Sequence, residues 1–245
     1  MKVALVTGGS KGIGLHVVIR LVNQGYKVVT CSRNKEAWSD ALKVHPELSA
    51  VDYQTVDIAN EQQLLELFAY VSERYGKLDV AVNNASPAIV SRGYLADVDI
   101  ALLKETLHVD FLCQALCLRA ELQLMEAGAS IVNVSSINGL RPTPNASMYS
   151  ASKHALEGLT RSVALESIAS GIRVNAVAPG VTWTPRWEDR AEETPNIRSE
   201  VSDVVPMKRF GEADEIVNAI AFLLSDDASY IVGHTLVVDG GLSLA

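Results

Sequence analysis

The residues with the clearest chemical potential lie in the stretch MYSASKHAL, residues 148–156, where Tyr149 stands four positions before Lys153. Residues four apart on a helix share a face, so the phenol and the ammonium would lie one above the other. A positioned phenol is a potential general acid, and a nearby cation stabilises its anionic form. The same spacing also arises by chance on solvated helix edges, so the pair alone leaves a catalytic and a surface interpretation open.

A second chemical signal is TGGSKGIG, residues 7–14, which follows a short apolar run and opens a helical pattern. Gly8, Gly12 and Gly14 let the backbone approach a ligand closely, and the helix N-terminus favours a phosphate or pyrophosphate. A second apolar run follows within about 30 residues, which is the context of the dinucleotide-binding fingerprint. The loop therefore predicts a dinucleotide site rather than a purely structural turn.

Two cations indicate which dinucleotide the loop would hold. An acid at the end of the second apolar run, VVTCSRN, would bind ribose hydroxyls and repel a 2′-phosphate, but here Ser32 is followed by Arg33. Lys11 adds a second cation inside the glycine loop, and arginine suits bidentate contact with phosphate. The residues favour NADP(H) over NAD(H); the alternative is that Arg33 and Lys11 are ordinary surface charges.

The elements that would position these residues are short apolar runs alternating with helical patterns. Runs that are apolar throughout suit strands covered on both faces, so the order predicts an α/β fold, a doubly wound parallel sheet in a single Rossmann-type domain over residues 1–245. The apolar runs are 3–6, 27–31, 80–84, 130–134, 173–178 and 235–239. The helical patterns include 12–24, 61–74 and 214–224.

The most irregular segment, residues 179–207, has four prolines, two tryptophans and charges of both signs. Long mixed segments in compact enzymes are commonly lids, so we expect a substrate loop at about 183–207. The alternative is a solvated excursion without a role.

Composition excludes several classes of function. A net charge of −8 without a dense Lys/Arg run argues against nucleic-acid partners. No signal-like segment and no run of 18 apolar residues occurs, so we expect no membrane association and a cytoplasmic location. The three cysteines and five histidines show no metal-ligand spacing, so we expect no metal site.

Seven motifs in order resemble the short-chain dehydrogenase/reductase family over nearly the whole chain. They are TGGSKGIG, VDI at 56–58, NNAS at 83–86, NVSS at 133–136, Tyr149-x-x-x-Lys153, PGVTWT at 179–184 and VDGG at 238–241. The resemblance implies a seven-stranded parallel sheet and hydride transfer between a nicotinamide cofactor and a carbonyl or alcohol. It settles the opening ambiguity in favour of catalysis.

Roles carried over from the family fall on individual residues here. The family's catalytic serine lies 13 positions before its tyrosine, which selects Ser136 to hold the carbonyl oxygen, with Tyr149 as acid and Lys153 tuning it and bonding the nicotinamide ribose. The expected cofactor contacts are Gly8, Ser10, Lys11, Gly12, Ile13, Gly14, Ser32, Arg33, Asp57, Ile58, Asn83, Asn84, Ala85, Tyr149, Lys153, Pro179, Gly180, Val181 and Thr184.

Two positions depart from the family pattern. Asp110 stands where many relatives have an asparagine that holds a water in a proton relay, and its charge near Lys153 puts the rate in doubt, not the type of reaction. Ser86 replaces the usual glycine of NNAS, with little consequence expected.

The substrate is expected to be a free small-molecule ketone, aldehyde or secondary alcohol. The loops at 125–130 and 169–172, where relatives that reduce acyl-carrier-protein substrates present basic residues, contain no Lys or Arg. The expected pocket residues are Ile89, Asn138, Leu140, Met148, Trp183 and Trp187, the tryptophans being equally compatible with loop core.

Three alternative functions and an assembly follow from the same resemblance. The alternatives are a 3-oxoacyl-(acyl carrier protein) reductase-like enzyme, an epimerase or dehydratase using the cofactor transiently, and a catalytically impaired nucleotide-sensing protein kept open by Asp110. The family also implies a homo-oligomer, a tetramer or dimer, with helices at about 99–126 and 149–169 at one interface.

Overall fold

One parallel sheet organises the chain, and the computed structural model describes every residue from 1 to 245. Its seven strands lie in the order β3-β2-β1-β4-β5-β6-β7, and every neighbouring pair is parallel, which confirms the predicted fold class. The strands are β1 (Val3–Thr7), β2 (Lys27–Ser32), β3 (Asp52–Thr55), β4 (Val80–Asn83), β5 (Ser130–Val134), β6 (Arg173–Pro179) and β7 (Thr235–Val238).

Strand β3 is the one that the apolar pattern does not indicate. Its sequence, DYQT, is mostly polar, and it lies at the edge of the sheet, where it pairs only with β2. An edge strand is not enclosed by neighbours on both sides, so it needs no continuous apolar run.

The helices alternate with the strands as predicted. The α-helices are α1 (Gly12–Asn23), α2 (Lys35–Val44), α3 (Glu61–Tyr75), α4 (Ile100–Leu107), α5 (Cys113–Leu122), α6 (Ser147–Ser167), α7 (Pro185–Glu193), α8 (Ile197–Val204) and α9 (Ala213–Leu224). Short 3₁₀ turns are η1 (Pro46–Ala50), η3 (Ile137–Gly139), η4 (Ile168–Ser170) and η5 (Asp226–Ala228), and η2 (His108–Leu112) is a π-helical segment joining α4 to α5.

Helices cover both faces of the sheet. Alternate residues of β1 belong to different cores: Leu5 packs with residues of α3, α5 and α6, whereas Val6 packs with residues of α1, α2 and α9. Residues two apart on a strand point to the same face, so the two cores are the two sides of one sheet. No helix combines the length and apolar character needed to cross a bilayer.

The order of the strands creates a crevice at the carboxyl ends of the central strands. The chain winds outward from β1 to β2 and β3 in one direction and to β4 and beyond in the other, so the loops after β1 and β4 diverge. In open parallel sheets, ligands bind at the carboxyl ends of the strands at this reversal.

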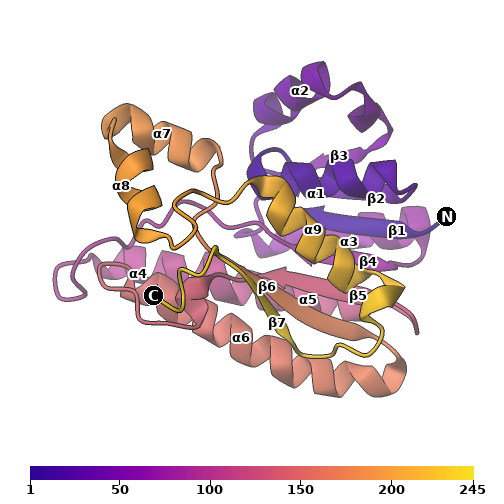
Figure 1. Ribbon diagram of the computed structural model, residues 1–245. Coiled ribbons are helices and arrows are strands. Elements are labelled where there is room, and N and C mark those ends of the chain that lie inside the picture. Colours follow the sequence, from indigo (N-terminus) through magenta and orange to yellow (C-terminus); the bar gives the residue numbers. More distant parts are fainter.

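The irregular segment predicted as a substrate loop contains two helices, α7 and α8. Pro185 is the first residue of α7, where its missing N–H costs nothing. Figure 1 shows the two helices standing as a pair on the side of the molecule away from the N-terminus.

Candidate active site

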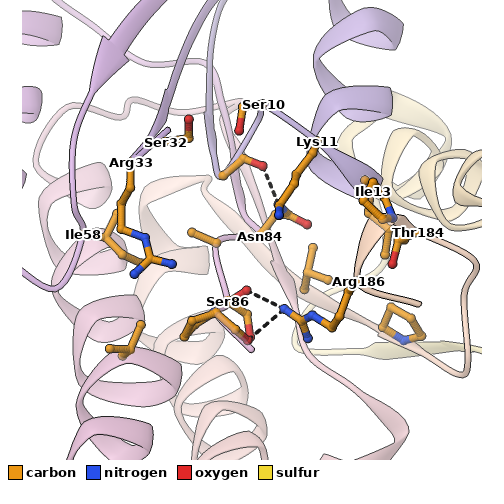
Figure 2. Close-up of a pocket in the computed structure, with 18 of the residues that line it drawn as sticks. Ser10, Lys11, Ile13, Ser32, Arg33, Ile58, Asn84, Ser86, Thr184 and Arg186 are labelled. Atoms are coloured by element: carbon orange, nitrogen blue, oxygen red, sulfur yellow. Dashed lines mark hydrogen bonds between the residues drawn. The ribbon is translucent and has the colours of Figure 1, made fainter. Parts of the chain in front are cut away.

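A cleft of about 440 Å³ lies where the loops after β1, β4, β5 and β6 meet. It brings together most of the predicted site residues, some of which Figure 2 shows as sticks. Those that line it are Gly8, Ser10, Lys11, Gly12, Ile13, Ser32, Arg33, Asp57, Ile58, Asn84, Ala85, Ser136, Tyr149, Pro179, Gly180 and Thr184.

The glycine loop leaves the start of α1 open to the cleft. Gly12 has a φ of +56°, a left-handed conformation that favours glycine. A Cβ on Gly14 would lie 2.2 Å from the carbonyl oxygen of Gly8, so only glycine fits there. No side chain caps α1, and its first turn has no acid. Its free N–H groups and positive dipole end are therefore suited to an anion such as a diphosphate.

Asn84 holds the glycine loop against the loop after β4. Its Nδ2 donates to the carbonyl oxygens of Thr7 and Gly8 at 3.1 and 3.2 Å, and its backbone N–H donates to Thr7 Oγ1 at 3.0 Å. The two walls of the crevice are thus fixed relative to each other before any ligand binds.

Lys11 and Arg33 are exposed side chains that line the same cleft. Neither forms a salt bridge with an acid of this chain. Figure 2 shows the two side chains entering the cleft from different elements, Lys11 from the start of α1 and Arg33 from the end of β2. Two cations that line the cleft without an acidic partner fit an additional phosphate group.

Tyr149 and Lys153 lie on α6 and are both nearly inaccessible, with exposed fractions of 7% and 2%. The Lys153 Nζ lies 5.7 Å from the centre of the Tyr149 ring and donates to the Val134 carbonyl oxygen at 3.2 Å. Tyr149 lines the cleft, whereas Lys153 lies behind that surface. The Lys153 ammonium is thus buried beside the Tyr149 ring.

Ser136 follows β5 on the same side of the cleft as Tyr149. Its Oγ accepts a hydrogen bond from the Asn138 N–H at 3.1 Å, which leaves the hydroxyl proton available for a ligand. Both side chains line the cleft. Each carries a hydroxyl group that can donate a hydrogen bond to a ligand in the cleft.

The two departures from the family pattern contact each other. Asp110 lies in η2, is 1% exposed, and its Oδ1 accepts a hydrogen bond from Ser86 Oγ at 2.6 Å. Ser86, from which the sequence predicts little consequence, is thus the hydrogen-bond partner of the buried acid. A glycine here would leave that carboxylate without this partner.

Five of the predicted catalytic and cofactor-binding residues do not line the cleft: Gly14, Asn83, Asp110, Lys153 and Val181. Of the expected substrate-pocket residues, Trp187 lines the cleft, whereas Ile89, Asn138, Leu140, Met148 and Trp183 do not. The Asn83 side chain turns into the core, where its Nδ2 donates to Glu121 Oε2 at 2.9 Å and to Asn133 Oδ1 at 3.0 Å. Its side chain therefore joins β4 to its neighbours, and any cofactor contact from this position would come from the backbone.

Sequence reasoning missed several lining residues, among them Asn34, Pro87, Pro185 and Arg186. Arg186 Nη2 donates to the carbonyl oxygens of Ser86 and Pro87 at 2.7 and 2.8 Å, bridging α7 to the loop after β4, as Figure 2 shows. The signal that could have found it is the proline before it, because proline commonly begins a helix.

The two tryptophans of the substrate loop pack on one side chain. Trp183 and Trp187 contact the buried Phe210 ring edge-on, with centroids 5.1 and 5.0 Å apart. Trp187 also lines the cleft, whereas Trp183 does not. Trp183 therefore packs on Phe210 without lining the cleft, and Trp187 does both; each tryptophan is half-buried.

Comparison with known proteins places this geometry in a family. A profile of the family described as enoyl-(acyl carrier protein) reductase matches residues 8–243. The chain is 35% identical to the short chain dehydrogenase/reductase astE of Aspergillus oryzae, over 99% of this chain and 95% of the relative. The chain is a short-chain dehydrogenase/reductase.

This short-chain dehydrogenase/reductase is also similar to two further proteins. It is 36% identical to the 3-oxoacyl-[acyl-carrier-protein] reductase of Homo sapiens over 99% of this chain and 98% of the relative. The solved structure of ElxO with NADP bound has a TM-score of 0.93 and 31% identity, and the match covers 100% of this chain and 99% of that one. The chain is therefore an oxidoreductase. ElxO, a protein of the same fold, has been solved with NADP bound.

Proposed function

We propose that the protein transfers a hydride between NADP(H) and a small-molecule ketone, aldehyde or secondary alcohol. The observation that carries the proposal is the arrangement of Ser136 and Tyr149 on the cleft surface with the Lys153 ammonium 5.7 Å from the phenol ring. A developing alkoxide needs a proton and hydrogen-bond donors, and this arrangement supplies both.

Ser136, Tyr149 and Lys153 have different roles in this reaction. The bound nicotinamide would supply the hydride. Ser136 Oγ donates to the carbonyl oxygen and fixes its direction, and the Tyr149 hydroxyl delivers the proton to that oxygen as it gains negative charge. Lys153 is held by the Val134 carbonyl and stabilises the phenolate left on Tyr149. In the oxidising direction the Tyr149 phenolate would take the proton from the alcohol hydroxyl.

The cleft fits NADP(H) at its other end. The uncapped start of α1 provides N–H groups for the diphosphate. Lys11 and Arg33 supply two unpaired cations for the 2′-phosphate that distinguishes NADP(H) from NAD(H). An acid in their place would have favoured NAD(H).

Reduction of 3-oxoacyl groups on acyl carrier protein is a second candidate, favoured by the identity to the human reductase. Against it, the loops at 125–130 and 169–172 carry no cation to meet an acidic carrier protein. The two candidates share the same chemistry and differ in the size and charge of the substrate.

Replacement of Tyr149 tests the proposal. Tyr149→Phe removes the proton donor but keeps the ring, so we expect kcat to fall by roughly a hundredfold or more while the Kd for NADPH stays the same. Turnover is followed as NADPH oxidation with a panel of ketones, aldehydes and a 3-oxoacyl thioester, and binding as NADPH fluorescence.

Two results would contradict it. Retained activity in Tyr149→Phe would remove the tyrosine from its assigned role. Tight NADPH binding by the unaltered protein without turnover of any substrate would instead favour the nucleotide-sensing alternative.

A further inference from the structure

Three arginines belong to α7 and to the loop after β4, the two segments that Arg186 joins by its hydrogen bonds, and Arg186 lines the cleft together with Tyr149. Arg186 and Arg190 belong to α7, and Arg92 to the loop between β4 and α4. The protein as a whole carries a net charge of −8, so a purely positive cluster stands out against the surrounding charge. Neither the family motifs nor the assigned mechanism uses these three side chains.

The α7 side of the cluster is rigidly placed. Arg186 and Arg190 are one helical turn apart, so they share a face. Trp187 between them is fixed against the buried Phe210, and the Arg190 guanidinium stacks over the Trp187 ring at 4.3 Å. Both arginines are half-buried. Arg186 makes its two hydrogen bonds through Nη2, so its Nε and Nη1 remain free to bind a ligand.

Arg92 lies on a tethered loop, and its side chain is exposed. Its neighbour Ser91 is buried and accepts a hydrogen bond from Thr106 on α4 at 2.8 Å. The Gly93 N–H donates to the Asn145 carbonyl at 3.0 Å, just before α6 begins. The Arg92 backbone is thus held beside the N-terminal turn of α6, which carries Tyr149.

None of the three cations has an acidic partner. No salt bridge joins Arg92, Arg186 or Arg190 to any carboxylate, although α7 carries four acids. Burial lowers the pKa of Arg92, the charges of Arg190 and Arg186 lower it further, and Tyr149 opposes the change. The Arg92 side chain is exposed to solvent, which weakens these interactions. An anion placed among the three side chains would relieve this repulsion.

We propose that Arg92, Arg186 and Arg190 form a carboxylate-binding subsite of the substrate pocket, so that the protein prefers oxo acids and hydroxy acids to neutral ketones and alcohols. The inference rests on the proposed reductase function and names its substrate class. The anion lies close to Tyr149 and hence to the reacting carbonyl. The phosphates of a pantetheine or coenzyme A thioester are separated from their carbonyl by the whole pantetheine arm, which favours a carboxylate.

Matched acids and esters provide the test. Substrates are 4-oxopentanoate, 3-oxocyclohexanecarboxylate and 4-oxocyclohexanecarboxylate, each beside its methyl ester, with acetoacetyl-coenzyme A as the thioester. We expect at least one acid to exceed its ester by roughly tenfold or more in kcat/KM, mainly through KM, because guanidinium–carboxylate bonds are strong. A preference for every ester, or for the thioester over all acids, would overturn the proposal.

Variants locate the preference. Arg92→Ala and Arg190→Ala should each lower the ratio of kcat/KM for an acid to that for its ester severalfold, with the Kd for NADPH unchanged. Arg198→Ala is the matched control for Arg190→Ala, because Arg198 stacks on Trp183, which does not line the cleft, whereas Arg190 stacks on Trp187, which does. Weaker NADPH binding with an unchanged ratio would assign the arginines to the cofactor instead and overturn the subsite.

A binding measurement separates this proposal from the proposed function. Calorimetry compares the hydroxy acid cis-4-hydroxycyclohexanecarboxylate and 3-hydroxycyclohexanecarboxylate with their methyl esters on protein saturated with NADP⁺. Tighter binding of an acid, lost in Arg190→Ala, supports the subsite even where no turnover is seen. Equal binding of acids and esters by an active enzyme overturns the subsite and leaves the reductase function standing.

Discussion

At the scale of single residues, the proposed preference for NADP(H) over NAD(H) rests on the positive charges of two side chains. Arg33 and Lys11 line the cleft without acidic partners, so each can contribute its full charge to a bound phosphate. A hydrogen bond to a charged group contributes about 1.5–3 kcal/mol, which corresponds to roughly a ten- to hundredfold change in affinity.

Arg33→Ala should therefore raise the Kd for NADPH by roughly tenfold or more and leave that for NADH nearly unchanged. Lys35→Ala is the control, because Lys35 is an exposed cation two residues later that does not line the cleft. Fluorescence titration with both nucleotides measures the ratio. An unchanged NADPH/NADH ratio in Arg33→Ala would mean that the phosphate lies elsewhere.

The site residues that the sequence predicts are those whose relative geometry is set within one short segment of the chain. The glycine loop and the Tyr149–Lys153 pair each lie within one turn or one helix, so spacing alone reports their geometry. The contact between Ser86 and Asp110, and the hydrogen bonds from Arg186 to the Ser86 and Pro87 carbonyls, join residues from distant parts of the chain. Such contacts depend on how the elements pack, and no local pattern encodes them.

At the scale of elements, the sequence pattern indicates those strands and helices whose burial repeats regularly along the chain. Buried strands and amphipathic helices were found because burial on both faces, or on one, imposes a periodicity. The polar edge strand β3 was missed, and α7 and α8 lay within a segment predicted as a loop. Helix α7 has no buried residue, so it has no apolar stripe to read.

A buried polar chain links four of these elements. Asn83 on β4 donates to Glu121 on α5 and to Asn133 on β5, and Asn133 Nδ2 donates to Thr160 on α6 at 2.9 Å. Burial raises the pKa of Glu121 to about 8, although the hydrogen bond from Asn83 opposes the shift. In the unfolded chain this carboxyl ionises near 4.5, so folding takes up a proton between those values.

Stability should consequently fall as the pH rises from about 4.5 through 8, since the folded form holds the proton and the unfolded form releases it. Glu121→Gln has no proton to take up. Its Tm relative to the unaltered protein should therefore increase by roughly 5 °C or more between pH 5 and pH 8.5, on about 1.4 kcal/mol per unit of pKa.

Calorimetry at the two pH values measures this difference. Glu105→Gln, which replaces an exposed carboxylate on α4, controls for the loss of one negative charge. An equal Tm offset at both pH values in Glu121→Gln would show that another group takes up the proton.

At the scale of the whole molecule, apolar side chains are exposed along neighbouring helices on one face. Leu107 on α4, Leu112 in η2 and Leu165 on α6 have exposed fractions of 43%, 42% and 75%. Helices α4, η2 and α6 pack against one another on the same side of the sheet. Grouped apolar exposure of this kind marks an interaction surface, and a self-complementary one suits a two-fold dimer.

We therefore expect the protein to form a dimer or tetramer through this face. Light scattering after size exclusion should give a multiple of the 26.4 kDa chain mass. The double variant Leu112→Glu/Leu165→Glu should lower that mass, because it places charges where the copies meet. Val44→Glu, at a residue 72% exposed on α2, which packs on the opposite side of the sheet, should not. A monomeric unaltered protein, or a double variant of undiminished mass, would show that these leucines do not form the contact.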